Sequence, residues 1–233
     1  MNIKELLTIV IPCKNESEII NLTLGLLNNQ KYISGTKIII CDSSTDNTKE
    51  EVLSKNYKNI QIEFTEGGIP SIARNKGAIL SETKYVLFLD ADIFLTDKNT
   101  LFETLKIIDN HNLDLVTTRF RCEGKYFYTY PIFEFFRNWF LYHSPFVLGG
   151  FMLFNRNKFF ELGGFNSDFL FAEDYDLSNK VSPDKIAIAK NKVYTTDRRL
   201  RKKGLWYMMK MMILSMLNKN NPDFFKKDHN YWI

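Results

Sequence analysis

Short runs of apolar residues alternate with helix-like patterns in the first part of the chain. The apolar runs predict buried strands over residues 6–11, 36–41, 60–64 and 85–89. Between them, apolar residues recur at helical spacing from Glu16, in the segment through Val52 and over residues 71–80. This alternation predicts an α/β fold with a mostly parallel central sheet and helices on both faces.

The strand predicted from Tyr85 runs directly into two carboxylates. Asp90 and Asp92 follow its apolar residues, and the apolar run then resumes. In open α/β sheets ligands bind beyond the carboxyl ends of the strands, and Asp42 follows another predicted strand in the same way. Two carboxylates this close repel each other, and a hard ion such as Mn²⁺ or Mg²⁺ carried on a diphosphate would remove that repulsion. The alternative is that both side chains end the strand and face water.

The composition is that of an ordinary globular protein, with 233 residues, 45% of them hydrophobic and 25% charged. The net charge of +4 favours anionic small molecules or a lipid surface over nucleic acid as a partner. Three cysteines without C-x-x-C spacing indicate a reducing compartment, so we expect a cytoplasmic protein without structural zinc. No signal peptide is predicted, because the apolar run over residues 6–11 is too short.

No linker rich in Ser, Gly or Pro divides the chain, so we predict a single domain. We expect three parts within it: residues 1–117, residues 118–204 and a helical tail over residues 205–233. The second part contains a stretch dense in aromatic residues, 126–154. Two interpretations of this stretch stay open: a pair of helices packed in the core, or an aromatic wall beside a binding site.

The turn after the first predicted strand lacks the glycines of the common phosphate-binding loops. Its sequence is Pro12-Cys13-Lys14-Asn15-Glu16. Dinucleotide-dependent dehydrogenases need G-x-G-x-x-G at this place, and P-loop enzymes need G-x-x-x-x-G-K-[ST]. The sequence therefore excludes both classes.

The motifs that are present resemble, in order, those of family 2 nucleotide-sugar glycosyltransferases, which have the GT-A fold, a Rossmann-like α/β architecture. Each motif is weak alone, and the order and spacing of the five carry the resemblance over residues 7–205. Cys41 departs from the pattern, since the family has an acid there. The matching segments are residues 8–16 for the strand and its P-x-x-N-E turn, 41–46 for D-D-x-S-x-D, 73–77 for A-R-N-x-G, 90–92 for D-x-D, and 163–165 with 173–177 for G-G-F and E-D.

The resemblance implies a donor site for a nucleotide-diphospho sugar, and it favours a UDP-sugar. Asp92, with Asp90, would hold Mn²⁺ or Mg²⁺ against the two phosphates. Asp42 would hydrogen-bond the base, and Arg74 would meet the diphosphate unless it is a cation on a helix surface. The residues implied to line the nucleoside are Pro12, Lys14 and Glu16.

The resemblance also implies a general base in the second part of the chain. It assigns this role to Asp174, with Glu173 and Asp176 as rivals, because three acids in four residues could also begin an acidic helix. An acceptor hydroxyl, on a carbohydrate or a lipid-linked molecule, would attack in line and invert the anomeric centre. Two alternatives stay open: a polyprenyl-phosphate glycosyltransferase with a lipid phosphate as acceptor, and a catalytically idle sugar-nucleotide-binding module.

A basic run over residues 196–204 follows. Arg198 or Arg199 could clamp the diphosphate with a planar guanidinium, while the alternative is a solvated charged face. Relatives often place a metal-binding histidine hereabouts. This segment has none, and Asp197 is the residue that could substitute for it.

Residues 205–217 are apolar on nearly every side but too few to span a bilayer. As a helix they would form part of the core or of a homodimer interface. With the preceding basic run, the tail could instead make a peripheral contact with an anionic membrane. No nucleic-acid partner is expected.

Overall fold

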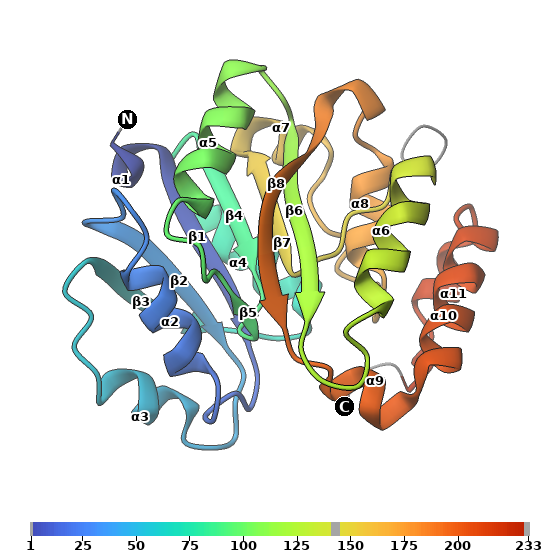
Figure 1. Ribbon diagram of the computed structural model, residues 1–233, viewed down its shortest axis with the longest axis horizontal. Coiled ribbons are helices and arrows are strands. Elements are labelled where there is room, and N and C mark those ends of the chain that lie inside the picture. Colours follow the sequence, from blue (N-terminus) through green and yellow to red (C-terminus); the bar gives the residue numbers. More distant parts are fainter. Residues whose placement is uncertain (1, 141–144, 231–233) are drawn as a thin grey trace.

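The computed structural model describes residues 2–140 and 145–230, and its strands form one central sheet (Figure 1). The order across the sheet is β3-β2-β1-β4-β7-β6-β8-β5. The strands are β1 (Leu7–Cys13), β2 (Thr36–Asp42), β3 (Ile60–Glu66), β4 (Tyr85–Leu89), β5 (Ile93–Phe94), β6 (Leu115–Cys122), β7 (Phe151–Asn155) and β8 (Ile186–Thr195).

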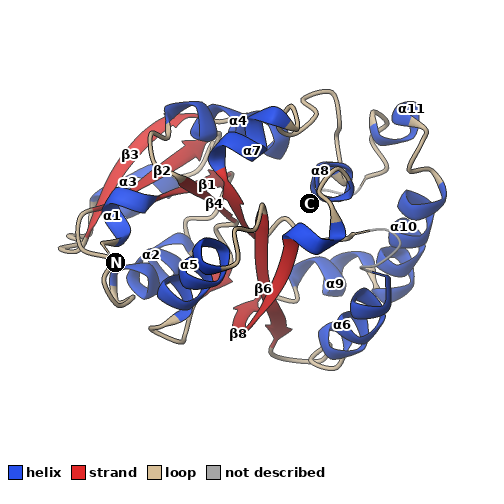
Figure 2. Ribbon diagram, turned by 90° about the horizontal axis from the view of Figure 1, so that it is seen from above, coloured by secondary structure: helices blue, strands red, loops and turns tan. Residues whose placement is uncertain are grey.

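Helices cover both faces of the sheet, with α2 and α5 on one face and α4 and α7 on the other (Figure 2). Helices α6, α9 and α10 lie beyond β6 and β8 (Figures 1 and 2). The helices are α1 (Ile3–Leu6), α2 (Ile20–Asn28), α3 (Thr48–Leu53), α4 (Pro70–Leu80), α5 (Thr100–Asn110), α6 (Thr129–Phe140), α7 (Arg156–Glu161), α8 (Glu173–Asn179), α9 (Arg198–Lys203), α10 (Leu205–Leu217) and α11 (Pro222–Phe225).

The first four strands have the predicted parallel arrangement. β1 pairs in parallel with β2 and β4, and β2 pairs in parallel with β3. Their carboxyl ends therefore lie at one edge, where Cys13 of β1 is in register with Asp42 of β2. β7 runs antiparallel between β4 and β6, which makes the sheet mixed but mostly parallel. The predicted α/β fold class is confirmed.

The buried central strand β4 explains why the edge beyond it is well defined. All five of its residues are buried, as a strand covered by helices on both faces requires. On one face Phe88 packs against Phe159 and Phe165, at ring-centroid distances of 4.9 and 5.0 Å. Helix α4 also lies close to the sheet, because a Cβ atom at Gly77 would come within 2.2 Å of Val10 Cγ1. This close packing fixes the helix that carries Arg74.

The structure resolves part of the question about residues 126–154. The helix-pair interpretation is wrong, because α6 is the only helix among the described residues of this stretch and Phe151–Asn155 form the inner strand β7. The run Phe151–Phe154 is short, buried and preceded by Gly149-Gly150, which favours a strand over a second helix. His143, which belongs to the same aromatic stretch, lies outside the described residues.

Candidate active site

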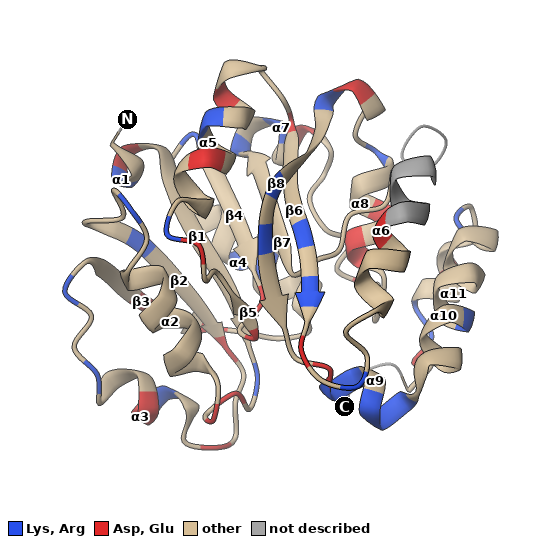
Figure 3. Cartoon of the chain, viewed as in Figure 1, with Lys and Arg blue, Asp and Glu red and all other residues tan. Residues whose placement is uncertain are grey.

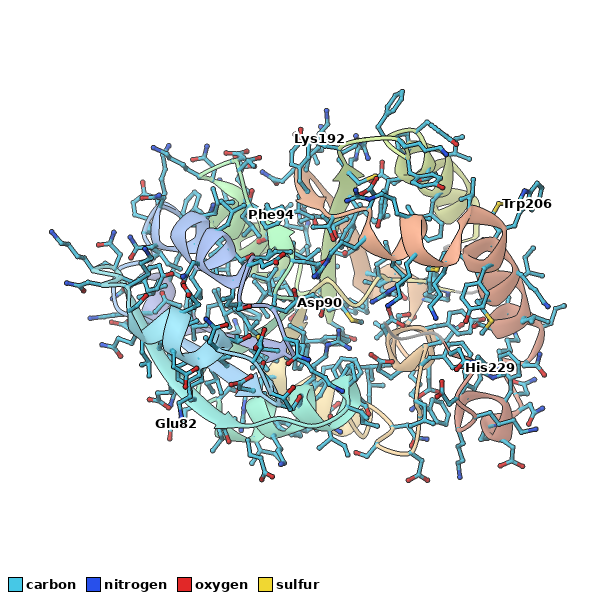
Figure 4. All side chains as sticks on the ribbon, turned by 90° about the horizontal axis from the view of Figure 1, so that it is seen from below. Glu82, Asp90, Phe94, Lys192, Trp206 and His229 are labelled. Atoms are coloured by element: carbon cyan, nitrogen blue, oxygen red, sulfur yellow. The ribbon has the colours of Figure 1, made fainter. Side chains whose placement is uncertain are left out.

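The acid pair after β4 sits at the centre of the carboxyl edge, where Figure 4 labels Asp90. The chain turns there, and Ile93 N–H donates to the Asp90 carbonyl at 3.1 Å. The short strand β5 then pairs with the end of β8, with Ile93 in register with Thr195. This pairing brings Thr196 to Asp92, and its hydroxyl donates to Asp92 Oδ2 at 3.0 Å. Asp92 is thus held by the segment that follows β8.

Arg74 is a buried ion-pair bridge rather than a cation on a helix surface. Its Nη2 lies 2.6 Å from Asp90 Oδ1, and its Nη1 donates to Glu173 Oε1. The side chain is only 3% exposed, and its Nε has no hydrogen-bond partner among the described residues. Arg74 therefore ties the end of β4 to the start of α8, two segments far apart in sequence.

Asp174 lies beside this bridge. Its Oδ2 accepts from Gly149 N–H at 2.6 Å, and its Oδ1 accepts from Tyr175 N–H at 2.8 Å. A Cβ atom at Gly149 would lie 3.0 Å from Arg74 Nη2 and 3.1 Å from Asp174 Oδ2, so the guanidinium and the carboxylate flank the same glycine. Asp174 and the acid pair after β4 therefore belong to one site.

The backbone before Asp174 is unusual. Ala172, the residue that precedes helix α8, has φ 56° and ψ 26°. Side chains with a Cβ atom seldom adopt this left-handed conformation, and where they do, the surrounding structure enforces it, often at active sites. This turn directs the first residues of α8 toward Arg74 and Gly149.

The site changes the protonation of its acids. Burial, then the charge of Glu173, raises the pKa of Asp174 to about 7, although Arg74 and the two backbone N–H groups act in the opposite direction. Burial and the charge of Asp90 raise the pKa of Asp92 as well. A carboxylate whose pKa lies near neutrality is suited to take up and release protons, so Asp174 has the property that a general base needs.

The basic run after β8 reaches into the same edge. Arg198 Nη2 lies 2.9 and 2.8 Å from the two carboxylate oxygens of Glu16, and 3.7 Å from Asp92 Oδ2. The charge of Arg199 also acts on Asp92 and lowers its pKa, against the larger effect of burial. Figure 3 shows helix α9 as a cluster of basic residues at the edge where the acids lie. The solvated-face interpretation does not fit Arg198.

The residues predicted to line a nucleoside lie at the ends of β1 and β2. Asp42 is the last residue of β2, and its Oδ1 accepts from Ser44 N–H at 3.0 Å. Pro12 is partly buried near the end of β1, whereas Lys14 is exposed in the turn that follows. The structure thus brings Pro12, Asp42 and Glu16 to the same edge as Asp92.

The predicted metal site fits a metal ion that arrives together with phosphate oxygens. No cluster of three or more His, Cys, Asp or Glu side chains among the described residues could hold an ion by itself. Asp197, the suggested substitute ligand, is instead paired with Arg201 at 2.6 Å. Asp90 and Asp92 offer two carboxylates. Mg²⁺ is commonly bound by one or two carboxylates when a substrate supplies phosphate oxygens as the other ligands.

Two residues of the site were not predicted from the sequence. Gly149 and Thr196 contact Asp174 and Asp92 through a backbone N–H and a hydroxyl. The only signal for Gly149 was its place in a Gly-Gly pair, which marks a turn or a close approach without saying to what. Thr196 is the first residue of the basic run and belongs to no motif of its own.

Curated relatives match part of the chain. Poly(ribitol-phosphate) beta-N-acetylglucosaminyltransferase TarP of Staphylococcus aureus (strain N315) is 31% identical over 124 residues, which cover 51% of this chain and 37% of TarP. The uncharacterized glycosyltransferase YibD of Escherichia coli (strain K12) is 33% identical over 107 residues, 45% of this chain and 30% of YibD. The chain thus matches about a third of the length of these relatives.

Solved structures show the same fold. S. aureus TarS in complex with UDP-GlcNAc has a TM-score of 0.64 and 21% identity, covering 83% of this chain and 59% of that one. Mannosyltransferase PcManGT from Pyrobaculum calidifontis in complex with GDP-Man and Mn²⁺ has a TM-score of 0.62 and 20% identity, covering 89% and 64%. These neighbours show that the fold is GT-A. Because residues 8–163 also match the model of the family described as "Glycosyl transferase family 2", the chain belongs to that family.

Proposed function

We propose that this chain is a metal-dependent, inverting glycosyltransferase that moves a sugar from a nucleotide-diphospho sugar, a UDP-sugar, to an acceptor hydroxyl. The observation that carries the proposal is the continuous contact Asp90–Arg74–Glu173, with Asp174 next to it. This contact supports the proposal, because an acid pair that would hold the metal and diphosphate and a carboxylate that would act as the base then lie close together. A binding module without catalysis has no need for a carboxylate whose pKa is raised toward neutrality.

In the proposed reaction Asp174 removes the proton of the acceptor hydroxyl. The acceptor oxygen attacks the anomeric carbon, the bond to the diphosphate oxygen breaks, and the nucleoside diphosphate leaves with the electron pair. Gly149 N–H and Tyr175 N–H hold the carboxylate in place, and each of its oxygens keeps a lone pair for the proton. In-line attack from the side opposite the leaving group inverts the configuration.

The donor is held at the other side of the site. We propose that Asp92 and Asp90 bind Mn²⁺ or Mg²⁺ together with the diphosphate, and that this ion neutralises the charge of the leaving group when bound. Asp42, Pro12, Lys14 and Glu16 would hold the nucleoside. Arg198 would move from Glu16 onto the phosphates, and Arg199 would bind there beside it, since a bidentate guanidinium suits both carboxylate and phosphate oxygens.

The proposal also covers the domain boundaries, the acceptor and the donor class. We treat residues 1–233 as one catalytic domain, in which residues 1–117 bind the donor and 118–204 bring the base and the acceptor. The acceptor is a carbohydrate or a lipid-linked molecule. UDP-GlcNAc in the TarS complex supports a UDP-sugar as donor, and GDP-Man with Mn²⁺ in PcManGT makes GDP-sugars the competing class.

Thermal unfolding in the presence of UDP-, GDP- and dTDP-sugars, each with Mn²⁺ or with EDTA, tests the donor and the metal together. One nucleotide family should stabilise the protein by about 2.7 kcal/mol at a hundred times its Kd, and only with Mn²⁺. Asp92→Asn should lose the metal-dependent part. Glu63→Gln, whose carboxylate pairs with Lys37 on neighbouring strands, should keep it. Equal stabilisation in EDTA contradicts the metal, and no response to any nucleotide sugar contradicts the donor.

The pH dependence of turnover tests the base. Burial and Glu173 raise the pKa of Asp174 to about 7, so it keeps its proton to a higher pH than an ordinary aspartate. A base must be ionised to accept a proton, and activity should therefore be lost as the pH falls through about 7 and reach a plateau above it. Initial rates at saturating donor measure this profile, with donor binding followed over the same range as the control. A flat profile down to pH 5 would be incompatible with this base.

A further inference from the structure

Helix α10 presents an apolar face that nothing in the described part of the chain covers. Trp206, Met209, Ile213 and Leu217 recur three or four residues apart, so they lie along one side of the helix. All four are exposed, with Trp206 at 82% and Leu217 at 76%. In Figure 4 Trp206 lies at the margin of the molecule. Four large apolar side chains in one row form a patch of the kind that marks an interaction surface.

The opposite side of α10 is fully engaged. Met211 is buried in a cluster with Tyr175 of α8 and Phe225 of α11. The Tyr207 hydroxyl donates to the His229 carbonyl at 2.7 Å, which fastens the segment after α11 to the helix. The helix is therefore fixed in place by its own chain, and its outward face is free to dock on something else.

The charge around this face says what covers it. From Arg198 to Pro222 the chain has no Asp or Glu, while Lys202, Lys210 and Lys219 are exposed. Two copies joined through this face would bring two such segments together without a single opposite charge between them. An anionic lipid surface, in contrast, accepts the lysines at its headgroups and the apolar side chains below them.

We propose that α9 and the outward face of α10 form a docking surface for an anionic membrane. Basic α9 lies at the carboxyl edge of the sheet (Figure 3), and Met211 of α10 belongs to the same buried cluster as Tyr175 of α8, the helix of Asp174. Docking places the site beside the bilayer, where a lipid-anchored acceptor could reach it. Among residues 2–140 and 145–230, no helix has the length and apolarity to span a bilayer. The contact that we propose is a peripheral one. Vesicle binding does not depend on the proposed transfer reaction, and either proposal can fail alone.

Co-sedimentation of the whole chain with vesicles tests the docking surface. Binding should be strong to phosphatidylcholine mixed with phosphatidylglycerol and weak to phosphatidylcholine alone, and salt should weaken it. Trp206→Ser with Leu217→Ser should lower the partition coefficient about tenfold or more, because two large side chains no longer enter the bilayer. Lys202→Gln with Lys210→Gln should lower it for anionic vesicles only.

Matched controls separate this face from general stickiness. Leu53 and Ile79, on α3 and α4, are 65% and 66% exposed, and Leu53→Ser with Ile79→Ser should leave vesicle binding unchanged. Equal binding to neutral and anionic vesicles, or no binding to either, would overturn the proposal. So would a homodimer, measured by light scattering, that dissociates in the Trp206→Ser/Leu217→Ser variant, because the face would then belong to a second copy.

Discussion

Replacing Asp174 with asparagine is expected to lower turnover by about a hundredfold to ten-thousandfold, the usual contribution of a general base. Asparagine has the same shape, and its amide oxygen can still accept from Gly149 N–H. The fold and the donor site should therefore survive. Donor affinity should stay within about twofold, because the proposed role of Asp174 is to contact the acceptor and not the donor. Single-turnover rates and calorimetric titration of the donor measure the two quantities separately.

Asp176→Asn is the matched control for this experiment. Asp176 lies two residues further along the same helix, and its carboxylate pairs with Lys180 at 2.8 Å on the next turn. It was a rival for the base in the sequence, but in the structure it pairs with Lys180, the residue that follows the helix. Asp176→Asn should therefore keep turnover. Loss of turnover in Asp176→Asn together with full activity in Asp174→Asn would show that the wrong acid was chosen.

The first four strands were predictable because their signals are local. β1, β2 and β4 each contain a short apolar run that a polar residue follows near the carboxyl end, and a parallel sheet brings such ends to one edge. The five motifs added the fold family, which the comparisons confirm. The other four strands, β5 to β8, were not predicted. For β7 the reason is that a short apolar run inside an aromatic stretch has no periodicity that separates strand from helix.

The side-chain partners within the site were not predictable, because they join residues far apart in sequence. Arg74 was expected to meet a ligand or water, yet it is buried between Asp90 and Glu173. The sequence of helix α4 does not indicate that Glu173 of α8 will supply the second carboxylate. Arg198 was assigned to a phosphate, and in the structure it holds Glu16, from the other end of the chain. Such pairs follow from the fold and not from any one motif.

Replacing Arg74 with methionine should lower the free energy of unfolding by about 3–5 kcal/mol, the usual cost of removing one partner from a buried ion pair. Methionine fills part of the volume, but Asp90 and Glu173 lose their shared cation, and Glu173 is only 4% exposed. Urea unfolding measures the change. Lys76→Met is the matched control on the same helix, since its pair with Glu66 is exposed and should contribute less than about 1 kcal/mol.

Removing the second buried charge should recover part of the loss. In Arg74→Met with Glu173→Gln, the buried carboxylate is gone along with its partner, so the double variant should be more stable than the sum of the two single changes predicts. The charge of Arg74 also lowers the pKa of Asp174, so the pH at which Arg74→Met loses activity should rise. A variant as stable as Lys76→Met, with an unchanged pH profile, would mean that Arg74 does not join the two halves of the site. The stability and the electrostatics of the site thus depend on one residue, and the two measurements test that dependence separately.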